Sequence, residues 1–205
     1  MSPSWTVRRP MIWGLVVINI LFIGTLLYLA PRTILHSRLP ANASTLPVLA
    51  APAAFELTRE TGEGFSSASL KGRPWIADFI FTRCPNQCPA MSFRFAALQK
   101  TLPSGVRLVS FSTDPEYDSP ARLSEYAQRF KADPKKWVFL TGNLGVIHGI
   151  QTELHLIKAE ERDPGLHSLR FVLMDSEGRA RGYYDSEDGG SLEKLNKDLK
   201  KLERA

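Results

Sequence analysis

Cysteine is scarce in this chain: its 205 residues contain two, Cys84 and Cys88. Two cysteines cannot form the framework of a disulfide-stapled mini-protein, which needs several bridges because its core is too small. The chain does not lack apolar residues, which make up 43% of it against 23% charged residues. This balance excludes collagen-like, mucin-like and largely disordered proteins. We therefore expect one domain of ordinary size, alone or with an attachment.

Acidic residues are absent from the first fifty positions, which contain four arginines. All 21 acidic side chains lie further along, interspersed with the other basic residues. No basic stripe is long enough to follow a phosphate backbone, so the net charge of +5 does not indicate a nucleic-acid partner. We attribute the excess positive charge, which lies in the first fifty residues, to membrane topology instead.

Residues 11–30 carry no charge and are rich in Ile, Leu and Val. At 1.5 Å per residue they would form a helix of about 30 Å, the hydrocarbon thickness of a bilayer. The alternative is a cleaved signal peptide, but its apolar region is normally about 7 to 15 residues long and a small-x-small cleavage site follows it. Ala30-Pro31-Arg32 is a poor site of this kind. The sequence thus favours an uncleaved transmembrane anchor.

Two arginines precede the span and two follow it, which makes the positive-inside signal weak. We interpret residues 1–10 as a tail on the cytoplasmic or matrix side. The rest of the chain would then face the periplasm or the mitochondrial intermembrane space. Residues 31–54 contain four prolines, and their apolar residues do not follow the spacing of a helix or a strand for long. This composition is expected for a semi-extended tether, which would let the domain meet a partner in the same membrane.

Residues 55–205 alternate apolar runs with amphipathic stretches, which is typical of an α/β domain. Ser119 is placed as a helix N-cap and Pro120 as the first helical residue. Right-handed crossovers would make the early strands parallel, giving a mixed sheet with helices on both faces. The sequence predicts strands at 75–81, 106–111, 137–140, 169–174 and 181–184, helices at 88–98, 120–130, 146–152 and 192–202, and a hairpin turn at 176–178.

The two cysteines lie four residues apart, where a buried strand gives way to a helix. Pro89 is comfortable only in the first turn of a helix, so the helix should start near Cys88 and Cys84 should lie in the turn before it. The positive end of a helix lowers a thiol pKa and favours the thiolate, which attacks disulfides and binds soft metals. A pliable turn would accommodate either a dithiol or a disulfide. We interpret the pair as functional because the chain has no other cysteine.

A metal site needs a third ligand, and the candidates are four histidines. His36 lies in the tether, and His148 and His155 lie in apolar stretches where packed or half-exposed histidines are the usual finding. His167 follows an Asp-Pro-Gly turn signal and directly precedes a predicted strand, so it could approach the cysteines. Two thiolates and one imidazole suit Cu(I) better than structural zinc, which normally has four protein ligands.

In combination, several motifs resemble the Sco/SenC family of copper-binding cytochrome c oxidase assembly proteins. They are TRCPNQCP at 82–89, DPEYDSP at 114–120, LTG at 140–142, and HS at 167–168 ahead of FVLMD at 171–175. The resemblance implies a thioredoxin-like fold in which Cys84, Cys88 and His167 bind copper, as Cu(I) or Cu(II). It also implies copper delivery to a client, or reduction of the client's thiols, which favours a metallochaperone and leaves a thiol:disulfide oxidoreductase activity open. The client would be the copper A centre of oxidase subunit II, or another copper or thiol client.

One residue departs from the family pattern: Asp78 interrupts the apolar strand six positions before Cys84. A buried carboxylate at this spacing resembles the proton acceptor of thioredoxin-type oxidoreductases, and burial would raise its pKa. Alternatively, Asp78 faces outward on an edge strand or pairs with Arg83 or Arg94. A thiol:disulfide oxidoreductase that uses the Cys84 and Cys88 pair therefore remains the second hypothesis.

A peroxiredoxin is a third and weaker hypothesis, because that class has two residues between its Thr and Cys and this chain has one. We interpret Asp114 and Asp118 as turn and cap residues, since Asp beside proline commonly has these roles. A group of acidic residues upstream of His167 is interpreted as a solvated loop; its members are Glu160, Glu161 and Asp163.

Overall fold

A computed structural model of the chain describes residues 19, 21–22, 46–158, 160 and 168–203. The chain divides into two compact units, residues 1–41 and 42–205, and the second is described below. The proposed membrane span at 11–30 falls almost wholly outside the described residues. Among the residues that are described, no helix is long and apolar enough to cross a membrane.

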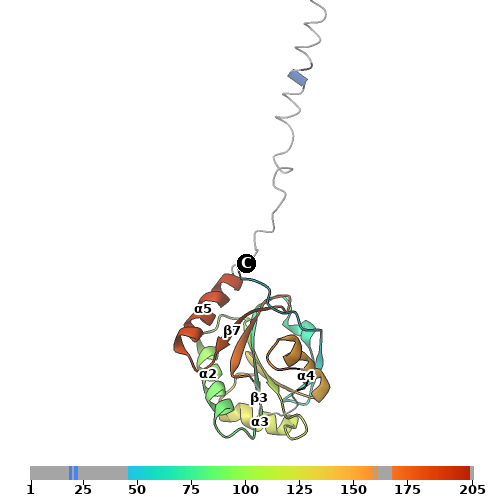
Figure 1. Cartoon of the computed structure of the whole chain (residues 1–205), viewed down its shortest axis with the longest axis vertical. Helices are drawn as coiled ribbons and strands as arrows, with labels where there is room; N and C mark the ends of the chain where they lie inside the picture. Colours follow the sequence, from blue (N-terminus) through green and yellow to red (C-terminus); the bar gives the residue numbers. More distant parts are fainter. Residues whose placement is uncertain (1–18, 20, 23–45, 159, 161–167, 204–205) are drawn as a thin grey trace, which may run out of the picture. The chain divides into compact units, whose positions relative to one another are not determined.

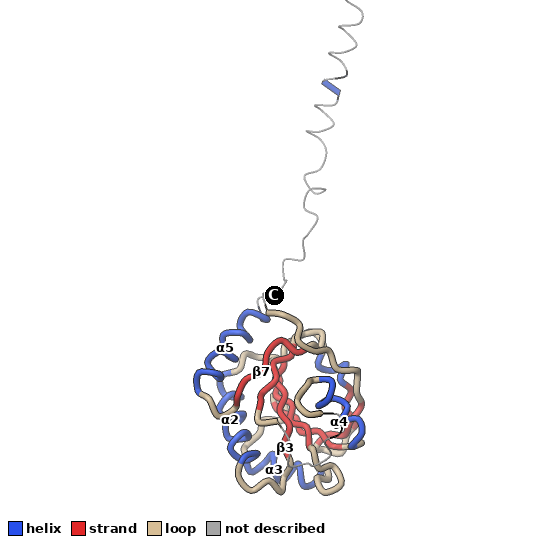
Figure 2. The backbone as a smooth tube through the Cα atoms, viewed as in Figure 1, coloured by secondary structure: helices blue, strands red, loops and turns tan. Residues whose placement is uncertain are grey.

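The domain is built on one mixed sheet of seven strands, seen in red in Figure 2. Its spatial order is β2-β1-β5-β4-β3-β6-β7. The neighbours β3, β4 and β5 are parallel, while β1 and β6 flank this trio in the antiparallel sense. The strands are β1 (Glu56–Arg59), β2 (Gly64–Ser66), β3 (Trp75–Ile80), β4 (Arg107–Ser112), β5 (Trp137–Thr141), β6 (Arg170–Met174) and β7 (Ala180–Asp185).

Helices cover both faces of the sheet, as predicted (Figure 1). The bounds are α2 (Gln87–Thr101), α3 (Pro120–Arg129), α4 (Leu144–Glu153), α5 (Gly189–Glu203) and the short 3-10 helix η1 (Ser67–Leu70). Alternate residues of β3 point to opposite faces. Ile76 and Ile80 join a core with α2, α3 and α5, whereas Ala77 and Phe79 join a second core with α4 and η1.

The parallel strands give the sheet two chemically different edges. We call the edge where β3, β4 and β5 end the cysteine edge, because the Cys84 turn follows β3 there. The edge where these strands begin is the basal edge. β6 ends at the basal edge, since Met174 pairs with Trp75, and β7 starts there, since Ala180 pairs with Met174.

Part of the predicted tether lies against the domain at the basal edge. The Leu49 N–H donates to the Ala180 carbonyl, and the Ala180 N–H donates to the Ala50 carbonyl, each at 2.8 Å. Arg181 donates to the carbonyl of Leu46 and forms an ion pair with Asp175 at 2.8 Å. The chain therefore enters the domain at the basal edge, across the sheet from the cysteines.

Candidate metal and redox site

The two cysteines lie where the sequence places them, at the junction of β3 and α2. Helix α2 begins at Gln87, and Cys84 lies in the turn before it. Both are free thiols, with Cys84 at 8% exposure and Cys88 at 0%. The Cys88 N–H donates to the Cys84 sulfur at 3.3 Å, and the two side chains also hydrogen-bond each other. The two reduced thiols are thus already in contact, and almost none of their surface is exposed to solvent.

The two thiols differ in their acidity. Burial raises the pKa of Cys84, but N–H groups at the helix start and the Cys88 thiol outweigh it, so the net pKa lies below the usual range. For Cys88, burial raises the pKa far above that range, and the Phe81 N–H at 3.5 Å offsets only part of the rise. Cys84 is therefore the more acidic of the two thiols, and burial favours the protonated form of Cys88.

The loop at 114–120 contacts the cysteine turn directly, which local sequence reading did not predict. Asp118 is fully buried and accepts from the Thr82 N–H at 3.0 Å, from the Thr82 hydroxyl and from the Ser112 hydroxyl at 2.6 Å. Asp114 accepts two hydrogen bonds from the guanidinium of Arg83, the residue before Cys84. Both aspartates therefore position the turn as well as shape their own loop.

An aromatic and cationic group lies beside this turn. The guanidinium carbon of Arg83 is 4.3 Å from the Tyr117 ring centroid, and that of Arg122 is 3.8 Å from it. Such contacts are cation–π interactions. The Arg83 side chain is half exposed, so its guanidinium gives the surface next to Cys84 a polar, positively charged group.

Asp78 is buried in the central strand β3, on the face that carries α2. It is not on an edge strand, and Arg83 pairs with Asp114 instead of Asp78. Burial raises the pKa of Asp78 to about 7, and the neighbouring Ser110 hydroxyl offsets a small part of the rise. Neither carboxylate oxygen has a hydrogen bond of good geometry within the described part of the chain. Its charge is close enough to raise the pKa of Cys88 further.

The predicted third ligand, His167, lies outside the described residues. Of the other histidines, His148 is on α4, which covers the opposite face of the sheet, and His155 follows that helix. Within the ranges that the structure describes, no three side chains of His, Cys, Asp or Glu are grouped as a metal site. The described part of the site therefore consists of two free thiols, a positioning loop and a buried carboxylate.

Two adjacent thiols at a helix start, with one acidified, define a protein that exchanges disulfides or binds a soft metal. The family model described as SCO1/SenC matches residues 45–204, nearly the whole second unit. The SCO1 protein homolog of Bacillus subtilis is 32% identical over 159 residues, covering 71% of this chain and 79% of that protein. The chain belongs to the SCO1/SenC family.

Solved structures agree with this assignment. BsSco, a member of the Sco family of cytochrome c oxidase assembly proteins in which a disulfide switch was identified, is 31% identical with a TM-score of 0.65. The alignment covers 76% of this chain and 95% of that one. Arabidopsis thaliana ScoI with copper bound is 26% identical with a TM-score of 0.61, covering 76% and 100%. The mixed sheet with its helices matches the thioredoxin-like fold of Sco proteins.

Proposed function

We propose that this protein is a copper chaperone for cytochrome c oxidase assembly, in which Cys84, Cys88 and His167 bind copper. One observation carries the proposal: two unbridged thiols in contact at the start of α2, with the pKa of Cys84 lowered. A thiolate and a neighbouring thiol that loses its proton on binding would supply two soft ligands. The copper-bound Arabidopsis relative and the oxidase-assembly role of the Sco family support this choice of metal and client.

The sheet register supports His167 as the third ligand. Strand β6 runs antiparallel to β3, with Ala77 opposite Val172. β6 therefore begins, at Arg170, on the cysteine edge. Ser168, the residue after His167, precedes that strand. An imidazole next to this position would complete a three-coordinate site of the kind Cu(I) accepts, and the client proposed is the copper A centre of oxidase subunit II.

A copper titration of the reduced protein tests the ligand set. We expect one copper per chain for the wild type, loss of the thiolate-to-copper absorption in Cys84→Ser and Cys88→Ser, and weaker binding in His167→Ala. His155→Asn is the matched control, because His155 is exposed and Asn tolerates its positive φ of 53°. Equal copper affinity in the His167 and His155 variants would remove His167 from the site.

We propose further that residues 11–30 form a single membrane span and that residues 31–54 connect it to a domain in the periplasm or intermembrane space. The uncharged run at 11–30 supports this arrangement. Alkaline carbonate should leave the full chain in the membrane, and protease added from the domain's side should remove residues 55–205. Release by carbonate would argue against the anchor.

A second candidate function is thiol:disulfide exchange with partner cysteines, and the burial of Asp78 favours it. Its carboxyl, with a pKa of about 7, would accept the Cys88 proton as the disulfide forms and return it to the Cys88 thiolate as the disulfide breaks. Asp78→Asn should then slow exchange near neutral pH while leaving copper affinity unchanged. Equal exchange rates in the two proteins would leave only the copper function.

A further inference from the structure

Four basic side chains surround a hollow of about 310 Å³ at the basal edge of the sheet. Lys71 and Arg73 come from the loop before β3, Arg107 is the first residue of β4, and Lys135 lies in the loop before β5. These positions meet because parallel strands begin at one edge of a sheet. Among the described residues, no acidic side chain lines the hollow.

The positive charge of this hollow is not neutralised within the described part of the chain. None of its four cations has a carboxylate within 4.0 Å there. Two nearby acids are engaged elsewhere: Asp133 accepts from the Lys135 backbone N–H at 2.9 Å, and Glu177 pairs with Arg179 at 2.8 Å. Uncompensated cations that converge on one hollow attract an anion.

One wall of the hollow is built around Arg73. Arg73 donates to the Ser104 carbonyl at 3.0 Å and lies across Gly105, where an added Cβ would be 2.5 Å from the Arg73 Cδ. The loop is thus shaped around the arginine. Trp75 is buried, and its indole N–H has no acceptor among the described residues. Charged donors bind phosphate oxygens more strongly than neutral ones do.

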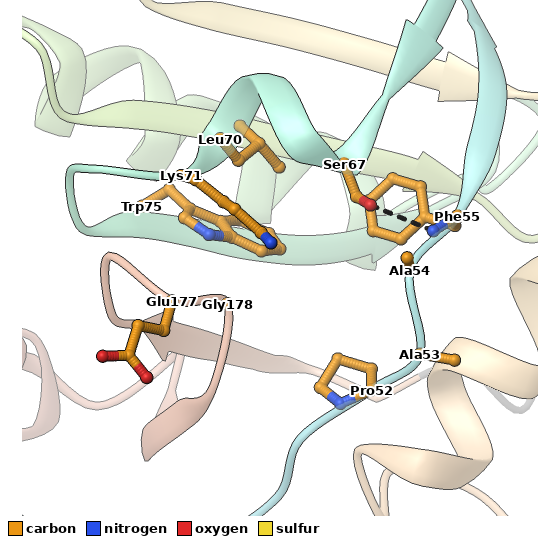
Figure 3. Close-up of a pocket in the computed structure, with 10 residues that line it drawn as sticks. All are labelled: Pro52, Ala53, Ala54, Phe55, Ser67, Leu70, Lys71, Trp75, Glu177 and Gly178. Atoms are coloured by element: carbon orange, nitrogen blue, oxygen red, sulfur yellow. Dashed lines mark hydrogen bonds between the residues drawn. The ribbon is translucent and has the colours of Figure 1, made fainter.

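The chain enters the domain beside this hollow. Figure 3 shows Pro52 and Ala53 of the entering segment across an adjoining hollow of about 190 Å³, which shares Lys71 and Trp75 with the basic one. The entering segment is the last part of the proposed tether, which follows the proposed span at 11–30.

We propose that the hollow binds the phosphate groups of anionic phospholipids and seats the basal edge on the bilayer. The cysteine edge would then face away from the lipid, by about 20 Å over the six residues of β3. This inference rests on the proposed membrane anchor. It adds an orientation: Cys84 is presented to partners that project from the membrane surface.

The test uses the full chain reconstituted in vesicles of phosphatidylcholine, with or without phosphatidylglycerol. We expect slower hydrogen exchange at residues 69–75 and 104–107 when phosphatidylglycerol is present, and loss of this protection in 1 M salt. Lys71→Gln/Arg107→Gln should abolish the protection. Lys194→Gln/Lys197→Gln is the matched control, because it removes the same charge from exposed positions on α5. Equal exchange in both lipids, or equal effects of both variants, overturns the proposal.

Carbonate extraction separates this site from the anchor. If carbonate releases the chain, the anchor has failed, and flotation of the released chain with phosphatidylglycerol vesicles tests the hollow alone. In that assay Lys71→Gln/Arg107→Gln should weaken binding about tenfold relative to the control variant. Inorganic phosphate is the remaining probe. Equal protection by millimolar phosphate in phosphatidylcholine vesicles would identify a free-anion site and overturn the lipid assignment.

Discussion

The carboxylate of Asp118 accepts a hydrogen bond from the backbone N–H of Thr82 at 3.0 Å, across 36 residues of sequence. It also accepts from the Thr82 and Ser112 hydroxyls, so one buried side chain connects the end of β4 to the turn before Cys84. Because Asp118 is 0% exposed, water cannot replace these bonds. The geometry of the cysteine turn therefore depends on a residue outside the cysteine motif.

Asp118→Asn should loosen this turn. The amide keeps one acceptor oxygen but places an NH₂ group against donors, so we expect a loss of about 2 kcal/mol or more in the free energy of unfolding. The local effect is a slower alkylation of Cys84 at fixed pH, since its N–H contacts shift. Urea unfolding measures the change in stability, and the rate of reaction with iodoacetamide measures the alkylation of Cys84. Asp133→Asn is the control, because that carboxylate accepts one exposed backbone hydrogen bond. An unchanged Cys84 rate would show that Asp118 supports only the fold.

The two thiols should react very differently with alkylating reagents. In Cys88→Ser, Cys84 keeps a hydroxyl donor and the N–H groups of α2, so its lowered pKa should give a thiolate at lower pH than in a free cysteine. In Cys84→Ser, the buried Cys88 should stay nearly inert because burial raises its pKa. The pH dependence of iodoacetamide labelling in the two variants checks this order. Faster labelling of Cys88 would reverse this order.

The protonation of Asp78 should make stability depend on pH. Its pKa is about 7 in the folded protein and 3.8 when unperturbed, so between these values the folded state binds the additional proton. Stability contributed by this group is therefore lost as pH rises from about 4 to 7. Asp78→Asn should raise the melting temperature at pH 8 and change it little at pH 4. An equal change at both pH values would mean that the carboxyl is not titrating in this range.

Much of the fold follows from local patterns. The apolar run at 75–81 forms β3, and Ser119 caps α3 with Pro120 as its first residue, as predicted. The predicted hairpin at 176–178 joins β6 to β7. The β1–β2 hairpin was not predicted, because strands of 4 and 3 residues are too short to show a period. Their position depends on pairing with β5, a contact across some eighty residues of sequence.

The site was predicted only in part, for the same physical reason. Cys84 and Cys88 stand out because both their spacing and their place at the start of α2 are local. The role of Asp118 depends on a partner 36 residues away, and its Asp-Ser-Pro surroundings indicate a turn equally well. Burial of Asp78 depends on its strand being central, which the strand order decides and the sequence of β3 does not. Long-range pairing thus separates what could be predicted from what could not.

Gly182 should be intolerant of any side chain, because its place is occupied by a tyrosine. A Cβ there would overlap the edge of the Tyr184 ring and its hydroxyl, which donates to the buried carboxylate of Asp198 at 2.9 Å. Gly182→Ala should therefore displace that hydroxyl and lower the free energy of unfolding by about 2 kcal/mol. Gly149→Ala on α4 is the control: nothing lies within 4 Å of its added Cβ, so the change should be neutral or stabilising. Combined with Tyr184→Phe, Gly182→Ala should be less harmful than the sum of the single changes, and strict additivity in urea unfolding would contradict this account.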